Sequence, residues 1–197
     1  MRVGIVGGGF DPIHYGHLLM GDAAIESKKV DVAWFMPCWG HTFGKDLTAA
    51  NHRLAMTELA VKGFDRCYAC PFEIENECTG STYNTLCLLR DAFKGTGVQL
   101  HYIIGSDNAQ KIDQWINWKK LIEEFKFIIT ERPGVQLPEW TKFHQVLPHA
   151  TESQTVNGEG ISSTMIRKWI KKGQDDLAMK YMPLQVFKYI KGQKLYV

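Results

Sequence analysis

Short apolar runs and amphipathic stretches alternate along the chain, and this alternation predicts strands and helices in turn. The apolar runs are rich in β-branched and aromatic residues, which is typical of strands buried on both faces. They lie at residues 2–7, 32–37, 98–104 and 126–130. Apolar residues at helical spacing predict helices at about 18–29, 50–62 and 82–94. The order favours an α/β fold with a Rossmann-like, doubly wound and mostly parallel sheet, in a single domain.

The other segments carry weaker patterns. A strand is predicted near residues 66–70 and a last strand over 143–147. Ser162 and Ser163 are typical of a helix N-terminus, and Pro183 of the first position of a terminal helix. The segment Phe72-Glu-Ile-Glu-Asn-Glu77 alternates, which predicts three carboxylates on a solvated edge or loop rather than a metal site. Residues 38–49 form a long loop, and loops of that length are often functional.

Composition and charge exclude several classes of protein. The 197 residues are 45% hydrophobic and 22% charged, as in an ordinary globular domain. No apolar run reaches the roughly 18 residues that span a bilayer, and no signal peptide is recognised, so we expect a cytoplasmic protein without a membrane partner. The net charge is +2, and residues 167–197 alone carry eight Lys or Arg and two Asp. A solvated helical face explains this stretch, a positive rim for a polyanion is the alternative, and no nucleic-acid partner is predicted.

The cysteines are expected to be reduced thiols that pack as small hydrophobic side chains. Cys67, Cys70, Cys78 and Cys87 could in principle supply four zinc ligands. The gap between the last two lacks the second short knuckle of a zinc site, so no metal ligand is predicted.

The turn after the first strand carries the candidate chemistry. It reads GGGFDPIHYGH over residues 7–17. Glycines at the end of a strand let backbone amides approach an anion, and the next helix adds its positive N-terminal dipole. The spacing of His14 and His17 puts both imidazoles on one face of the first helical turn. This arrangement favours binding of a phosphate, while a metal half-site or surface polar residues are the alternatives; Asp11 is expected to fix the turn.

The turn resembles the GGTFDPxHxGH signature of the nucleotidylyltransferase superfamily. A second segment, ISSTMIR over residues 161–167, resembles the ISSTxIR motif of the same enzymes. Three further segments are similar to bacterial nicotinate-nucleotide adenylyltransferases: IGSDNA at 104–109 with Trp115 after it, GSTYNTL at 80–86 and RLAM at 53–56.

The resemblance implies one nucleotidylyltransferase domain over residues 1–197, in which the helical part from about 160 closes the ATP site. Such an enzyme transfers the adenylyl group of ATP to the 5′-phosphate of nicotinate or nicotinamide mononucleotide, with release of pyrophosphate, in NAD biosynthesis. The implied catalytic residues are His14, His17 and Arg167. The implied ATP-binding residues are Gly8, Gly9, Phe10, His14, His17, Gly105, Asp107, Ile161, Ser163, Thr164 and Arg167. The implied mononucleotide-binding residues are Lys45, Arg53, Thr82 and Trp115. Mg²⁺ would be carried on the ATP phosphates, with no metal ligand from the protein.

The chain departs from the family pattern at three places: the first removes a hydroxyl contact to phosphate, and the other two lie near the mononucleotide and bear on which mononucleotide is the substrate. Gly9 stands where the family usually has Thr or Ser, the loop PCWGHTFGK at 37–45 is only loosely similar, and Ile116 replaces a Tyr. The choice between nicotinate and nicotinamide mononucleotide therefore stays open, as does the oligomeric state. The alternatives are an adenylyltransferase for another phosphate acceptor, such as phosphopantetheine, and a non-catalytic nucleotide sensor.

Overall fold

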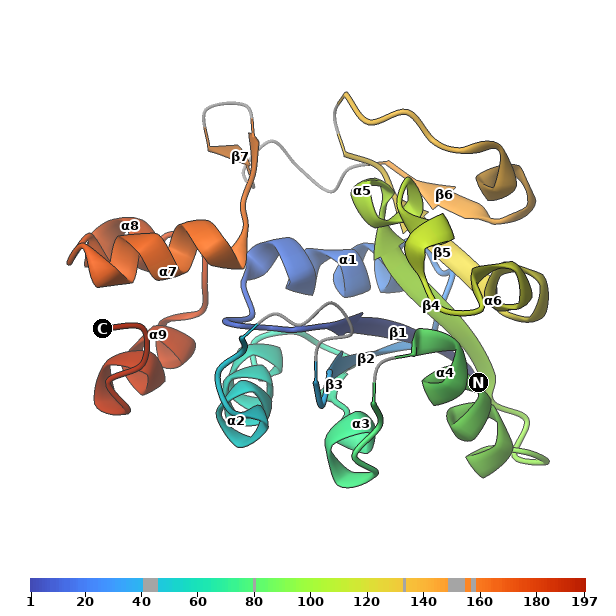
Figure 1. Ribbon diagram of the computed structural model, residues 1–197, viewed down its shortest axis with the longest axis horizontal. Coiled ribbons are helices and arrows are strands. Elements are labelled where there is room, and N and C mark those ends of the chain that lie inside the picture. Colours follow the sequence, from blue (N-terminus) through green and yellow to red (C-terminus); the bar gives the residue numbers. More distant parts are fainter. Residues whose placement is uncertain (41–45, 80, 133, 149–154, 157–158) are drawn as a thin grey trace.

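A computed structural model describes residues 1–40, 46–79, 81–132, 134–148, 155–156 and 159–197. Its centre is a six-stranded sheet in the order β3-β2-β1-β4-β5-β6, and all five strand pairs are parallel (Figure 1). The strands are β1 Arg2–Gly8, β2 Val32–Pro37, β3 Cys67–Ala69, β4 Gln99–Gly105, β5 Lys126–Thr130 and β6 Gln145–Leu147. The predicted doubly wound parallel α/β sheet is confirmed.

Helices cover both faces of this sheet because side chains alternate along each buried strand. Val6, Ile103 and Ile128 face one apolar core, whereas their neighbours along the strands face the other. The helices on the first face are α1 Tyr15–Glu26, α2 Ala50–Val61, α7 Ser163–Lys171, α8 Asp175–Met179 and α9 Leu184–Gly192. The second face is covered by α4 Thr82–Ala92, α5 Ser106–Ala109, the 3₁₀ helix η1 Ile112–Gln114 and α6 Trp118–Glu124.

The strand order positions the site. From β1 the chain adds β2 and β3 on one side, and then crosses to add β4, β5 and β6 on the other. Ligands of open α/β sheets bind where the order reverses, outside the carboxyl ends of the strands. Here these ends are Gly8 of β1 and Gly105 of β4. Figure 1 shows α7, α8 and α9 gathered at one end of the molecule, and the Tyr15 amide at the start of α1 bonds the Tyr181 carbonyl (2.9 Å).

Several predictions of local structure need correction. The segment after β3 is not a solvated edge: it folds into the short helix α3 Phe72–Glu75, and Glu73 is partly buried. Phe143 belongs to the 3₁₀ helix η2 Glu139–Phe143, so β6 is shorter than expected. Pro183 is the N-cap of α9 rather than its first residue. Helix α8 was not predicted.

A small antiparallel hairpin, β7 Thr155–Val156 with β8 Glu159–Gly160, follows β6, which is therefore not the last strand. The sequence between its strands reads Asn-Gly, a dipeptide typical of tight hairpins, and this signal was missed. All five cysteines are free thiols. In the part of the chain that the structure describes, no helix is both long and apolar enough to cross a membrane.

Candidate active site

The glycine turn lies at the carboxyl end of β1, beside the reversal of strand order. A Cβ atom added to Gly7 would collide with the Tyr102 hydroxyl, and one added to Gly8 would lie 2.9 Å from the Phe10 ring. Gly9 differs, because a Cβ there would meet only Leu47 at ordinary contact distance (3.5 Å). The first two glycines are therefore required by packing, whereas the turn has room for a side chain at Gly9. Phe10 is 2% exposed, so that only its backbone can face a ligand.

The two histidines stack at the start of α1. His14 is the N-cap residue and His17 lies in the first turn, and their ring centroids are 3.8 Å apart. The backbone N–H of His14 donates to Nδ1 of His17 (3.4 Å). Because Nδ1 accepts this bond, the proton of a neutral His17 ring is on Nε2. The first turn of the helix thus fixes His17 as a donor through Nε2.

Both imidazoles are kept neutral by their surroundings. Burial lowers the pKa of His17 to about 3, and the positive charge of Arg132 adds to the effect. Burial also holds the pKa of His14 well below its usual value, with the charges of His17 and Arg132 as smaller causes. Nδ1 of His14 has no hydrogen-bond partner among the described residues. At neutral pH the pair can donate hydrogen bonds to an anion, and the approach of an anion would favour its protonation.

The second predicted motif meets the first. Ser162 caps α7 by accepting from the Met165 amide (3.3 Å). The Ser163 hydroxyl donates to the Pro12 carbonyl (2.9 Å), and Nη1 of Arg167 donates to the Asp11 carbonyl (2.6 Å). Segments about 150 residues apart in sequence are thereby joined at the glycine turn.

The other residues of the second motif differ in exposure. Thr164 is exposed, and its Oγ1 accepts from Nη2 of Arg167 (3.4 Å). Ile161 is 3% exposed and belongs to the apolar core, so its side chain packs inside the protein just before α7.

The end of β4 contributes Gly105 and Asp107. A Cβ on Gly105 would lie 2.5 Å from Oδ1 of Asp107, so the carboxylate folds back over the strand end. Oδ1 is 3.3 Å from Nε of Arg132, and the Arg132 amide donates to the Ser106 hydroxyl (2.9 Å). Arg132 was not among the residues predicted for the site. It lies two residues after the end of β5, at the same carboxyl edge of the sheet, and this position was the signal that could have found it.

The residues predicted for the mononucleotide divide into three cases. Lys45 lies outside the described residues. Thr82 begins α4 and Trp115 follows η1; both are partly buried. The Trp115 ring meets the Tyr102 ring edge-on, with centroids 6.3 Å apart, and the Thr82 side chain lies near enough to the Tyr102 phenol to lower its pKa slightly against the larger effect of burial, which raises it. Thr82 and Trp115 therefore flank one buried tyrosine.

The prediction that Arg53 binds the mononucleotide needs correction. The Arg53 side chain is 1% exposed, and its guanidinium donates to the carbonyls of Thr48 (2.7 Å), Gly9 (2.9 Å) and Trp39 (3.0 Å). These bonds and the burial keep the guanidinium away from any bound phosphate. Arg53 instead supports the glycine turn from behind, through the Gly9 carbonyl.

Glu73, like Arg53, bonds the backbone at Trp39. The sequence predicted a solvated carboxylate here, whereas the Glu73 side chain is partly buried. Its Oε2 accepts from the Trp39 amide (3.3 Å). Burial raises the pKa of Glu73 to about 7, which the bond from the Trp39 amide, the nearby Thr85 side chain and the charge of Arg53 partly oppose. Glu73 thus ties α3 to the beginning of the loop after β2.

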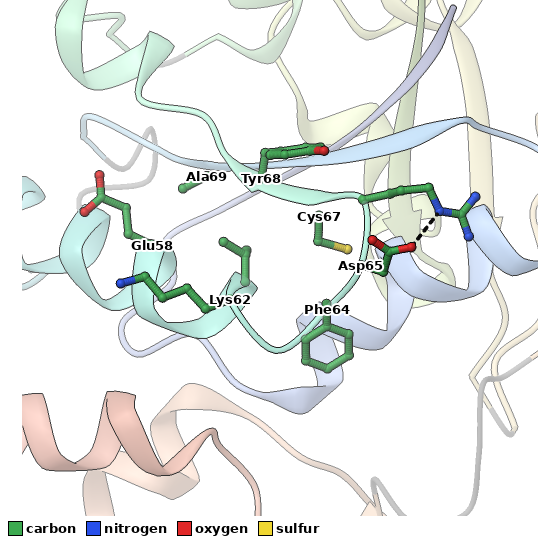
Figure 2. A pocket seen from close by; sticks show the side chains of 9 residues that line it. Glu58, Lys62, Phe64, Asp65, Cys67, Tyr68 and Ala69 are labelled. Carbon is green, nitrogen blue, oxygen red and sulfur yellow. Dashed lines mark ion pairs between the residues drawn. The ribbon is translucent and has the colours of Figure 1, made fainter.

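A separate groove of about 490 Å³ runs along the outer edge of the sheet (Figure 2). It is lined by β3 and the end of α2, including Lys62 and Tyr68, and one wall carries the Asp65–Arg66 ion pair (3.5 Å). None of the predicted site residues lines it.

The fold and the site define a class, the α/β proteins that bind phosphate groups at the carboxyl edge of a parallel sheet. A sequence model of the cytidylyltransferase-like family matches residues 5–169. The chain is 30% identical to a probable nicotinate-nucleotide adenylyltransferase of Bacillus anthracis, over 99% of this chain and 98% of that protein. It is 32% identical to one of Geobacillus thermodenitrificans, over 99% of this chain and 86% of that protein. The chain belongs to the cytidylyltransferase-like family and, within it, to the nicotinate-nucleotide adenylyltransferases.

Solved structures agree with this assignment. The nicotinic acid mononucleotide adenylyltransferase of Plasmodium falciparum, complexed with NaAD, is 25% identical, with a TM-score of 0.82 over 99% of this chain and 97% of that one. The same protein complexed with APC gives a TM-score of 0.80 over 99% of this chain and 96% of that one.

Proposed function

We propose that the chain transfers the adenylyl group of ATP to the 5′-phosphate of nicotinate mononucleotide, releasing pyrophosphate, as a step of NAD biosynthesis. One observation carries the proposal. The glycine turn with its histidine pair and the N-terminal turn of α7 meet at Asp11 and Pro12, at the reversal of strand order. The family to which the chain belongs, and the product named for the Plasmodium protein, support this substrate class.

The reaction needs no nucleophile from the protein. An oxygen of the mononucleotide phosphate attacks the α-phosphorus of ATP, a new P–O bond forms, and the bond to the β-phosphate breaks with its electron pair leaving on pyrophosphate. Catalysis then depends on holding the two phosphates in line and on stabilising the charge that gathers on them.

Each residue would act on a particular part of ATP. Nε2–H of His17 would donate to the α-phosphate, with His14 beside it. The amides of Gly8, Gly9 and Phe10 would face the phosphates. Arg167, Ser163, Thr164 and the Ile161 backbone would hold the departing β- and γ-phosphates, because Arg167 spends Nη1 on the Asp11 carbonyl and keeps other donors for phosphate. The helical part from about residue 160 would thus close the ATP site.

The adenosine and the mononucleotide would occupy opposite sides of the crevice. Asp107, after Gly105, would hold the adenosine ribose in exchange for its contact with Arg132. Trp115 would stack on the pyridine ring and Thr82 would lie near its substituent, while Lys45 would reach the mononucleotide phosphate.

Mg²⁺ would arrive on the phosphates of ATP and neutralise part of their charge. Among the residues that the structure describes, no three His, Cys, Asp or Glu side chains gather as a metal site. The carboxylate within the glycine turn, that of Asp11, already accepts hydrogen bonds from the Thr48 amide and the Tyr196 hydroxyl. We therefore propose no protein ligand for the ion.

The test is pyrophosphate release from Mg-ATP, measured side by side with nicotinate and nicotinamide mononucleotide. Fast release with the nicotinate substrate is the expected result, and the ratio of the two kcat/KM values gives the preference. Release with neither, from a folded protein that still binds ATP, would reject the proposal and favour another acceptor, such as phosphopantetheine, or a nucleotide sensor.

A further inference from the structure

The segment after α9 reaches back to the glycine turn. The hydroxyl of Tyr196 donates to Oδ1 of Asp11 (2.6 Å), across 185 residues of sequence. The Tyr196 side chain is partly buried against the same apolar core as α1, α2 and α7, and its hydroxyl lies 4.0 Å from the Met56 sulfur. This tyrosine is thus packed in place and is not a loose end on the surface.

Asp11 is the point at which four segments meet. The residue is 4% exposed. Its Oδ2 accepts from the Thr48 amide (3.2 Å), its Oδ1 from Tyr196, and its carbonyl from Nη1 of Arg167 (2.6 Å). Oδ2 is also 3.9 Å from Nη1 of Arg167. The carboxylate can keep its two hydrogen-bond donors or move into a closer ion pair with Arg167, but it cannot do both fully.

The backbone around Tyr196 indicates that its position is specific. Tyr196 has a φ of 63° and Lys194 a φ of 52°, in the left-handed region that disfavours residues other than glycine. Such conformations persist where the surrounding contacts determine them. Burial and the bond to Asp11 raise the pKa of Tyr196, which keeps the phenol protonated and able to donate.

We propose that Tyr196 is a positioning residue for ATP: by bonding Oδ1 of Asp11 it keeps the carboxylate from closing its long ion pair with Arg167 (3.9 Å), and so leaves the guanidinium available to phosphate. The inference rests on the proposed role of Arg167. Without the hydroxyl, the carboxylate loses one of its two hydrogen-bond donors and is drawn toward the guanidinium, where it competes with the phosphates.

The test compares Tyr196→Phe with Tyr189→Phe. The control removes a hydroxyl of the same kind, which bonds Nδ1 of His52 on α2 (2.8 Å) and does not touch the glycine turn. We expect Tyr196→Phe to raise both the Kd and the KM for ATP about fivefold to tenfold, with the KM for the mononucleotide unchanged. Tyr189→Phe should change each value less than twofold.

A double variant separates charge from packing. Asn at position 11 can still accept from the Thr48 amide but carries no charge, so Tyr196→Phe with Asp11→Asn should recover most of the ATP affinity. An unchanged Kd in Tyr196→Phe, or a double variant no better than the single one, would overturn the proposal. Because the Kd for ATP is measured without turnover, an inactive wild-type protein would reject the proposed function and still leave this comparison decisive.

Discussion

Two groups of side chains bond the backbone around the glycine turn in different ways. On the α7 side, which we propose binds ATP, the side chains of Ser163 and Arg167 bond the backbone of the turn directly, so that two distant motifs share one framework. On the side proposed for the mononucleotide, Arg53 and Glu73 bond the backbone of the turn and of the segment after β2. A charged residue near a proposed ligand site is therefore not necessarily a ligand residue. In our proposal Arg167 presents donors to ATP, whereas Arg53 and Glu73 hold the backbone.

The largest effect on the rate should come from removing His17, the donor proposed for the α-phosphate of ATP. His17→Ala should lower kcat by about 10²–10³, the loss expected for one donor to transition-state charge. His52→Ala, on α2 and bonded to Tyr189, is the matched control and should retain its rate. Steady-state kinetics on folded variants checks both. A His17 variant within a few-fold of wild type would remove the histidine from the chemistry.

Replacement of Arg53 should lower the free energy of unfolding rather than weaken binding of the mononucleotide. Arg53→Met leaves the carbonyls of Thr48, Gly9 and Trp39 without their charged donor, and the free energy of unfolding should fall by about 3 kcal/mol. Arg66→Met, which removes only exposed ion pairs, should cost less than about 1 kcal/mol. Urea unfolding measures both. Equal stability of the two variants, with a raised KM for the mononucleotide in Arg53→Met, would restore Arg53 as a ligand residue.

Arg167→Ala tests which substrate occupies the α7 side. The KM for ATP should rise roughly tenfold or more, because a charge-assisted bond to phosphate is lost. Lys168→Ala, its exposed neighbour on α7, should leave the same KM within twofold. If the KM for the mononucleotide rises instead, the two substrates lie the other way round.

The smallest effect concerns Glu73 and pH. Its pKa of about 7 lies above the ordinary value of 4.5, so between these two values the folded protein holds a proton that the unfolded chain has released. Stability should therefore fall as pH rises from about 4.5 to 7, by on the order of 1 kcal/mol from this group.

Glu73→Gln should flatten that slope in urea unfolding at several pH values. Glu75→Gln, which changes an exposed carboxyl of the same short helix, should keep it. Parallel pH profiles for wild type and Glu73→Gln would show that the Glu73 carboxyl is solvated.

Local signals explain what could be predicted from sequence. The strands 32–37 and 126–130 were placed correctly because β-branched and aromatic runs are read within a few residues. The His14 and His17 pair follows from helix geometry alone. The roles of Arg53 and Glu73 depend on partners 44 and 34 residues away, the Gly9 carbonyl and the Trp39 amide, and no local pattern contains these contacts. The cytoplasmic location and the ligand roles of Thr82 and Trp115 stay predictions.

The most direct test of the central claim follows the α-phosphorus of ATP. With ATP labelled at the α-phosphate, Mg²⁺ and nicotinate mononucleotide, we expect all transferred label in the dinucleotide, none in pyrophosphate and none on the protein. Label bound to the protein when the mononucleotide is withheld, or label in the released pyrophosphate, would contradict direct adenylyl transfer in this crevice.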